Sequence, residues 1–580
     1  MRRQTMDMLT LDQQRAIESQ GNVLVMAGAG TGKTRTLVER CLAGVLAPTD
    51  PVSLDAVLMV TFTEAAAGEM RKRIRERLEE QSRLAPADPW LAEQITLLDT
   101  ARISTLHSFC RQLVRDHFHD LGLDPEVAVL EPAQAEVLAA ETLDRLLQEH
   151  YAGDKPRDEA VRQLILTRGG GGDQAVRRLV RRVHDYTQTL PDPEGWFKRQ
   201  LAQLDVPQPA AWREWLATRL ADWRADWLET LSEIQAENPN AQSCRAALET
   251  LVCPACPGHL AEVLARILAA DDNWPAKRKS ALRPPLAELF TEADFLLSLV
   301  EPTRSTGEPS QDPLQEDWDW VRPHLQALLE LAQDFSREFA AAKRELGTVD
   351  FHDLEQFALE LLWDRAANRP TTIAQEWREK LALVLVDEYQ DINAAQDRII
   401  QAVSREGELA NRFLVGDVKQ SIYRFRLANP RIFQDYANQW RQPGAGGRVI
   451  PLSDNFRSHE AILNCVNALF AGWLRPEVGG VGYPEEARLR FGDPKRREHH
   501  AAKPKALAAP SQVGQPDPHG PPIELRLRLT GGAEAAEASD AQDASDPGGN
   551  FADHSDAEKE AALIGIRLRE LKEQGLPVWD

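Results

Sequence analysis

Residues 23–34, VLVMAGAGTGKT, decide the fold of this chain. An apolar run ends in a loop of small residues, and the Gly-Lys-Thr that closes the loop leads into a stretch of helical composition. A strand, a compact loop and a helix in this order are the context that a phosphate-binding loop requires. A glycine-rich turn without function is the alternative, and the conjunction of these features with Gly-Lys-Thr disfavours it.

Each position of this loop has a chemical reason. Backbone N–H groups can wrap around phosphates where side chains are small, as they are at Ala27, Gly28, Ala29, Gly30, Thr31 and Gly32. We expect Lys33 to reach the β- and γ-phosphates and the Thr34 hydroxyl to ligate Mg²⁺. The strict pattern begins with glycine, and Ala27 in its place still leaves the loop compact.

Residues 384–388, VLVDE, predict the second half of such a site. An apolar strand ends in Asp387, which is placed to hold Mg²⁺, and Glu388, which is placed to orient and deprotonate an attacking water. Two acidic residues after a strand are common. The pair becomes informative only together with the loop at Lys33.

The periodicity of the chain indicates an α/β fold with a parallel sheet. Short β-branched runs alternate with helical stretches in residues 1–118, and a second α/β pattern occupies residues 346–450. Between them, residues 119–345 repeat Ala, Leu, Glu and Arg at helical spacing. The simplest arrangement is one sheet interrupted by a large helical insertion, with residues 451–580 opening a further unit.

Composition bounds the class of protein. The 580 residues are 43% hydrophobic and 27% charged, and no apolar run approaches the roughly 18 residues that span a membrane. The N-terminus has no apolar signal-peptide core and the six cysteines are scattered, so we expect a cytoplasmic protein. A net charge of −22 means that any contact with nucleic acid must be made by a local basic surface.

Two groups in the insertion have both a plain and a functional interpretation. Four aromatic residues recur at helical spacing: Trp212, Trp215, Trp223 and Trp227. They could stack on bases, but we expect them to pack in a core. Four possible zinc ligands, Cys244, Cys253, Cys256 and His259, have a spacing that matches no common zinc finger, so we expect no metal there.

The composition changes near the C-terminus. Residues 492–556 are rich in Pro, Gly, Ala, Asp and Ser, which predicts disorder. Within them residues 523–529, IELRLRL, alternate as a strand does, and residues 557–574 have a helical pattern. The last residues resemble the entry to another strand, so we expect the chain to be incomplete.

Seven motifs follow one another in a recognisable order. They are LTxxQ at 9–13, the loop at 27–34, TFTxAA at 61–66, TLHSF at 105–109, DEYQD at 387–391, GDxKQSIYRFR at 416–426 and NFRS at 455–458. This series resembles the UvrD/RecB-type superfamily 1 DNA helicases. The amino-acid sequences of residues 415–430, 191–196 and 477–489 resemble those of AddA-type helicase/nuclease chains more than those of the other helicases of this type.

The resemblance implies a role for each motif. Gln13 would read the adenine edge of ATP, and Gln420 would sense the γ-phosphate. Tyr423 and Phe425 would stack on the bases of single-stranded DNA, with core packing as the alternative. Further DNA contacts would come from Phe62, Thr63, His107 and Arg426. Arg457 would reach the γ-phosphate from a second motor domain, and Phe456 would stack on adenine.

The resemblance also implies a fold and an activity. Two RecA-like domains would bind ATP and Mg²⁺ and drive 3′–5′ movement along single-stranded or tailed duplex DNA, in double-strand-break repair with an AddB-like partner. A DNA-independent phosphate-loop ATPase, or an ATP- and DNA-binding fragment that does not unwind, are the alternatives. The family's motifs V and VI and the AddA-type nuclease domain do not occur in this sequence. We therefore expect Arg457 to be poorly held and unwinding to be absent.

Overall fold

A computed structural model describes residues 9–170, 172–234, 238–252, 257–275, 278–300, 313–492 and 556–573. Its centre is a six-stranded sheet with the order β10-β1-β9-β8-β2-β3, in which every neighbouring pair is parallel. The strands are β1 (Asn22–Ala27), β2 (Val57–Thr61), β3 (Arg102–Thr105), β8 (Leu383–Val386), β9 (Arg412–Gly416) and β10 (Gly447–Leu452). The α/β prediction with a parallel sheet is confirmed.

Helices cover both faces of this sheet because alternate strand residues point to opposite sides. In β1, Val23 and Val25 pack into one core and Leu24 into the other. The first core is covered by α2 (Leu11–Glu18), α3 (Lys33–Val45), α4 (Glu64–Leu84) and α5 (Pro89–Leu97). The second is covered by α6 (Leu106–Asp116), α17 (Phe351–Leu362), α18 (Thr372–Lys380), α19 (Ala394–Val403) and α20 (Pro430–Trp440).

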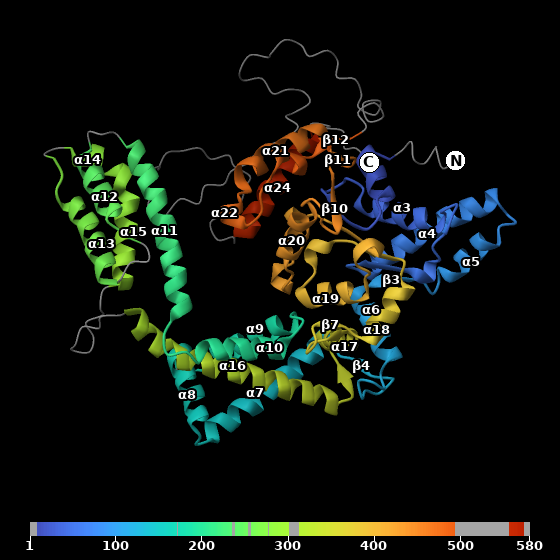
Figure 1. The fold of residues 1–580 in the computed structure, drawn as a ribbon, viewed down its shortest axis with the longest axis horizontal. Helices are drawn as coiled ribbons and strands as arrows, with labels where there is room; N and C mark the ends of the chain where they lie inside the picture. Colours follow the sequence, from blue (N-terminus) through green and yellow to red (C-terminus); the bar gives the residue numbers. More distant parts are fainter. Residues whose placement is uncertain are drawn as a thin grey trace, which may run out of the picture.

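The stretch expected to be helical lies between β3 and β8 in the chain and forms two packed groups. The first group contains α7 (Pro132–Ala152), α8 (Pro156–Gly169), α9 (Gln174–Gln188), α10 (Pro193–Leu204) and the long α16 (Pro313–Glu345). The second contains α11 (Ala210–Glu233), α12 (Pro239–Glu249), α13 (Pro257–Asp272), α14 (Lys279–Leu282) and α15 (Ala287–Val300). Figure 1 shows the second group standing away from the sheet, with α9 and α16 between them.

A short parallel ladder closes the base of the insertion. Strand β4 (Ala128–Val129) precedes the first inserted helix, and β5 (Thr348–Val349) follows the last. The two strands pair with each other, so the chain leaves and re-enters the sheet domain at one place. A small hairpin, β6 (Trp363–Asp364) with β7 (Arg369–Pro370), lies between α17 and α18 in the chain.

The tryptophans of α11 only partly follow the core-packing prediction. Trp223 and Trp227 pack against the second helical core, and both indole N–H groups donate to Glu292 Oε2, at 2.8 and 2.7 Å. Trp212 meets Trp318 edge to face. Trp215 is 66% exposed, so the prediction is wrong for this residue. It lies on the outer side of a helix that has a core on one side only.

The four cysteine and histidine residues have ordinary surroundings where they are described. Cys244 is fully buried in the apolar core of α12 and its neighbours. His259 Nε2 lies 3.0 Å from the carbonyl oxygen of Thr250. Cys253 and Cys256 lie outside the described residues, so the absence of a metal stays a prediction.

The chain passes beyond the sheet after β10. The expected division between residues 450 and 451 runs through β10, whose pairing with β1 continues to Leu452. The segment that follows contains β11 (Asp454–Asn455), α21 (Glu460–Trp473), α22 (Pro476–Gly479) and β12 (Arg490–Phe491), and β11 and β12 pair in parallel. Helix α24 (Asp556–Glu573) occupies the expected helical stretch, whereas the expected linker and strand at 523–529 lie outside the described residues.

Among the described residues, no helix is both long and apolar enough to cross a lipid bilayer.

Candidate functional site

The loop between β1 and α3 has the backbone that phosphate binding needs. Gly30 and Gly32 have φ values of 70° and 85°, which side chains other than glycine's rarely adopt. A Cβ on Gly30 would lie 2.7 Å from both Arg457 Cβ and Asn455 Nδ2, so no larger residue fits. Helix α3 begins at Lys33, and its N-terminal N–H groups point into the loop, where an anion is favoured.

Gln13 holds the loop from outside. Its Nε2 donates to the carbonyl oxygen of Thr31 at 3.0 Å, and its Oε1 accepts from the Thr10 backbone N–H at 3.0 Å. Thr10 in turn caps the first turn of α2, accepting from the Gln13 N–H. The buried Gln13 amide thus lies next to the phosphate loop, and both its donor and its acceptor are hydrogen-bonded within the protein. Its contact with adenine stays a prediction.

Three neighbouring strands bring the main polar residues together. The loop follows β1, Asp387 and Glu388 follow β8, and Gln420 follows β9, and these strands lie side by side in the sheet. Lys33 Nζ is 2.7 Å from Glu388 Oε2 and 3.5 Å from Gln420 Oε1. Polar groups at the carboxyl ends of adjacent parallel strands form the usual ligand site of an open α/β sheet.

Asp387 and Thr34 form an oxygen-rich corner beside this ion pair. Burial and the neighbouring Glu388 carboxylate raise the pKa of Asp387 to about 6, whereas Lys33, the Glu388 backbone N–H and a hydrogen bond from Thr34 lower it. A carboxylate and a hydroxyl are the ligands that Mg²⁺ prefers. A divalent cation here would take the place of the proton on Asp387, so the residues fit such an ion.

Glu388 adopts a strained backbone conformation. Its φ of 49° lies in the left-handed region, which costs a residue with a Cβ roughly 1–2 kcal/mol. This conformation turns the chain from β8 into the 3₁₀ turn η3 (Tyr389–Asp391) and directs the Glu388 side chain to Lys33. Such conformations persist where surrounding contacts enforce them.

Gln390 enforces this geometry, although we assigned it no role from the sequence. Its Nε2 donates to Glu388 Oε2 at 2.9 Å and to Asp391 Oδ2 at 3.0 Å, while its Oε1 accepts from the Asp417 N–H at 2.9 Å. Burial and then the Glu388 charge raise the pKa of Asp391 to about 6. The glutamine of the DEYQD motif was the available signal, because an amide can donate and accept at once.

Asp417 positions Gln420 in the same way. Its Oδ2 accepts from Gln420 Nε2 at 2.7 Å, and its Oδ1 accepts from Lys419 Nζ at 2.6 Å. Gln420 closes the 3₁₀ turn η5 (Val418–Gln420) and so presents its Oε1 to Lys33. The arrangement links β9 to the phosphate loop through one side chain.

The NFRS segment lies directly against the phosphate loop, so the backbone around Arg457 is better held than expected. Asn455 Nδ2 donates to the Ala29 carbonyl oxygen at 2.6 Å, and the Phe456 N–H donates to the Gly30 carbonyl oxygen at 2.8 Å. Asn455 Oδ1 accepts from the N–H groups of Arg457 and Ser458, at 2.9 and 2.8 Å. The backbone of Arg457 is therefore held by its immediate neighbours. The residue is exposed, so the position of its guanidinium stays a prediction.

The predicted base-stacking residues, Tyr423 and Phe425, form one aromatic row with Phe62. Phe62 stacks on Tyr423 with ring centroids 4.8 Å apart, and Tyr423 meets Phe425 at 5.8 Å. The Arg426 guanidinium lies over both of the latter rings, at 5.3 and 5.6 Å. Phe425 is 75% exposed, so the core-packing alternative is wrong for this residue, whereas Tyr423 is half-buried between its two neighbours. Phe62 is 40% exposed.

Thr63 and His107 make contacts within the protein. The Thr63 hydroxyl accepts from the Ala66 N–H and caps α4. His107 Nε2 lies 2.9 Å from Oε1 of the buried Glu355. Burial raises the pKa of Glu355, but the hydrogen bond and charge of His107, together with the charge of His352 and a hydrogen bond from Gln396, outweigh this effect and lower it. A DNA contact by either residue stays a prediction.

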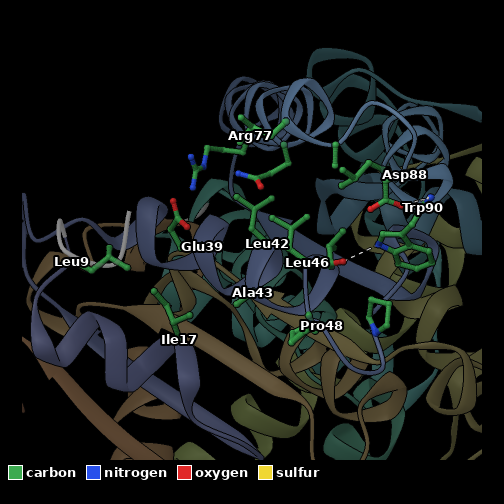
Figure 2. A pocket seen from close by; sticks show the side chains of 17 residues that line it. Leu9, Ile17, Glu39, Leu42, Ala43, Leu46, Pro48, Arg77, Asp88 and Trp90 are labelled. Carbon is green, nitrogen blue, oxygen red and sulfur yellow. Dashed lines mark hydrogen bonds between the residues drawn. The ribbon is translucent and has the colours of Figure 1, made fainter. Parts of the chain in front are cut away.

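A separate pocket, shown in Figure 2, is not part of this site. Its volume is about 560 Å³, and Leu42, Leu46 and Trp90 line it. The lining residues of α3 belong to the C-terminal half of that helix, about 13 Å along the axis from Lys33. The phosphate loop lies at the opposite end of α3.

Known proteins resemble this chain over most of its length. The model of the UvrD/REP helicase N-terminal domain matches residues 9–441. The chain is 35% identical over 97% of its length to an ATP-dependent helicase/nuclease subunit from Pelotomaculum thermopropionicum, covering 46% of it. It is 34% identical to the protein of that name in Moorella thermoacetica, over 98% of this chain and 44% of that one. A Bacillus cereus relative is also 34% identical, over 83% of this chain and 41% of the relative.

The chain thus spans slightly less than half the length of these curated relatives. The matched region contains the phosphate loop, the Asp387–Glu388 pair and the aromatic row. The chain belongs to the UvrD/REP helicase N-terminal domain family.

Proposed function

We propose that this chain uses ATP hydrolysis to move along single-stranded DNA, as part of a 3′–5′ helicase that acts in double-strand-break repair and recombination. One observation carries the proposal: residues 416–426 connect the candidate nucleotide site to an exposed aromatic row. Gln420 lies 3.5 Å from Lys33, and Tyr423, three residues later, stacks on Phe62. A short segment with a candidate phosphate sensor at one end and stacking rings at the other supports coupling between ATP and DNA.

The nucleotide chemistry follows from the side chains. Bound ATP with Mg²⁺ would supply the reactive γ-phosphate, with Thr34 and Asp387 holding the ion and Phe456 facing the adenine. Lys33 would leave Glu388 and bind the phosphates. Glu388, released from Lys33, would accept a proton from the attacking water, while Arg457 would stabilise charge on the γ-phosphate.

The DNA contacts use stacking, which is independent of base sequence. Every base has an aromatic face, so the exposed ring of Phe425 can accept any of them. Arg426 lies over the same rings and can contact the adjoining phosphate. Closure of the site around ATP would shift Gln420 and carry the aromatic row with it.

The relatives support a partner protein and a cellular setting. Each is named as one subunit of an ATP-dependent helicase/nuclease, which favours an AddB-like companion for this chain as well. The 3′–5′ direction and a cytoplasmic location belong to the same proposal and follow from family resemblance.

DNA-stimulated ATP turnover tests the proposal. We expect single-stranded oligonucleotides to increase ATP hydrolysis by the 580-residue chain, and Phe425→Ala to raise the DNA concentration for half-maximal stimulation. Loss of one stacked base is worth about 1–3 kcal/mol, a factor of roughly 5 to 150. Trp215→Ala, which removes another exposed aromatic ring, is the matched control and should leave stimulation unchanged. Equal ATP turnover with and without DNA would favour a DNA-independent ATPase.

A further inference from the structure

Helix α9 carries paired arginines opposite its buried face. Val176, Val180 and His184 are buried, four residues apart, and turn one side of the helix into the core. The sequence RRLVRR at 177–182 therefore places Arg177, Arg178, Arg181 and Arg182 outside that core. The chain as a whole has a charge of −22, so four cations within two helical turns form a local exception.

These arginines line a groove that ends at the aromatic row. The groove has a volume of about 780 Å³, and its lining includes the four arginines of α9 together with Arg424 and Phe425. Figure 1 shows α9 on the side of the insertion that is nearer to the sheet domain, whereas α11 to α15 stand away from it. The groove thus continues the surface on which Phe425 is exposed.

Two of the four arginines hold the insertion together. Arg177 pairs with Asp144 of α7 and, at 2.8 Å, with Asp173. Arg181 pairs with Glu136 of α7 at 2.9 Å and lies over the rings of Phe335 and Phe339. The charges of these two arginines are therefore compensated by carboxylates of the protein. Of the carboxylates that line the groove, only Asp185 is not used in these pairs.

The other two arginines have no such role. Arg178 and Arg182 are exposed, and no ion pair joins either of them to another residue of the described ranges. They stand one turn apart on the same helix face, where Cβ atoms are about 5–6 Å apart. Arg424, also exposed, supplies a third cation beside Phe425. The groove therefore has a net positive charge at an end where bases would stack.

We propose that Arg178 and Arg182 bind successive phosphates of the single strand that stacks on Phe425, so that the helical insertion forms part of the DNA track. This inference rests on the proposed function and adds a second binding surface to it. Arginine suits the task because its planar guanidinium matches a phosphate with two hydrogen bonds. Phosphate contacts carry no sequence information, which agrees with readout by stacking.

Salt dependence of DNA binding tests the proposal. Each phosphate contact to a single strand contributes about 0.7 to the slope of log affinity against log salt concentration. Arg178→Ala/Arg182→Ala should weaken binding of a fluorescent oligonucleotide to the 580-residue chain and reduce the slope by about 1.4. Arg178→Lys/Arg182→Lys should keep most of the slope, because the charges remain.

The matched control removes two charges elsewhere. Arg219 and Arg245 lie on α11 and α12, in the second helical group, and pair with exposed carboxylates. Arg219→Ala/Arg245→Ala should bind DNA as the wild type does, with the same slope. Circular dichroism of all three variants checks that the helices remain folded.

The outcomes separate the two proposals. If the wild type binds no single-stranded DNA, the proposed function fails and this inference fails with it. If the wild type binds and Arg178→Ala/Arg182→Ala gives an unchanged slope, the arginine track alone is overturned. An unchanged slope is also the result expected if the groove binds an acidic protein surface and not DNA.

Discussion

Lys33 Nζ and Glu388 Oε2 lie 2.7 Å apart, so the candidate phosphate-binding cation and the candidate general base neutralise each other. Gln390 and Gln420 contact the two partners from either side and hold them in register. We expect a phosphate bound at Lys33 to compete with Glu388 for the ammonium group. The ion pair would then couple occupation of the loop to release of the base.

Lys33→Ala should abolish ATP turnover and leave the fold intact. The substitution removes the phosphate contact but no core side chain, because Lys33 lies at the start of α3 outside both apolar cores. Steady-state ATPase assays measure the first effect, and circular dichroism with thermal unfolding measures the second. Normal turnover in this variant would contradict the assignment of the loop.

Glu388→Gln should slow ATP hydrolysis without weakening ATP binding. Hydrolysis should fall by roughly 100-fold or more, as expected when a general base is lost. ATP should bind as tightly as before or more tightly, because an amide holds the Lys33 amine less strongly than a carboxylate does. Titration with a fluorescent ATP analogue measures binding. Weaker binding would show that the ion pair does not compete with phosphate.

Glu249→Gln is the control for that experiment. Glu249 also forms an ion pair, with Arg245 at 2.9 Å, but on the exposed surface of α12. Loss of a surface pair of this kind changes stability by at most about 1 kcal/mol. Neither ATP binding nor turnover should respond.

The local part of the site was predictable from the sequence. The phosphate loop and the acidic pair after β8 each depend on residues that are neighbours in the chain, and the parallel sheet follows from apolar runs between helical stretches. Phe62 and Tyr423, which the motifs assign to one DNA-binding surface, lie side by side, although neither motif predicts that their rings stack. In these cases short-range pattern and chemistry define the residue's role.

The supporting contacts were not predictable, because their partners lie far apart in the chain. Asn455 bonds to Ala29 across 426 residues, and Gln390 bonds to Asp417 across 27. The arginines of α9 show the same limit. Their spacing indicates an exposed helix face, but only packing against α7 decides that Arg177 and Arg181 are compensated and that Arg178 and Arg182 are not.

His184 should make the helical insertion sensitive to acid. Burial lowers the pKa of His184 to about 3, with a further lowering by Lys343. In the unfolded chain a histidine titrates near about 6.5. As the pH falls through 6.5, the unfolded state binds a proton that the folded state does not, so stability is lost. Between pH 7.5 and 5.5 this one group should cost about 1.4 kcal/mol.

His184→Gln tests that contribution by difference. The variant should be less stable at pH 7.5, because the ring contacts with Phe335 and Phe339 are lost, but its stability should depend less on pH. Denaturant unfolding followed by the helical signal at pH 7.5, 6.5 and 5.5 measures the slope. His119→Gln, at an exposed histidine, should keep the wild-type slope. An equally steep loss in His184→Gln would assign the acid sensitivity to other groups.

Asn455 should control the mobility of Arg457. Its side chain is 1% exposed and makes three hydrogen bonds, one to the phosphate loop and two to the N–H groups that follow it. Asn455→Ala leaves those N–H groups without this partner, at about 1–3 kcal/mol for each group that stays buried. Asn455→Asp keeps the acceptor for Arg457 and Ser458 but sets a carboxylate oxygen against the Ala29 carbonyl. The two variants thus separate the tether to the loop from the support of the arginine.

Hydrogen exchange measured by mass spectrometry distinguishes these effects. In Asn455→Ala, exchange should rise in peptides that contain residues 456–458 and in those that contain the loop at 28–32. In Asn455→Asp, the loop peptides should show the larger increase, because Oδ1 can still accept from the Arg457 and Ser458 N–H groups. ATP turnover should fall more than ATP affinity in both, since an arginine on the γ-phosphate acts mainly in the transition state. Wild-type exchange at 456–458 in Asn455→Ala would mean that the Phe456 contact with Gly30 alone fixes the segment.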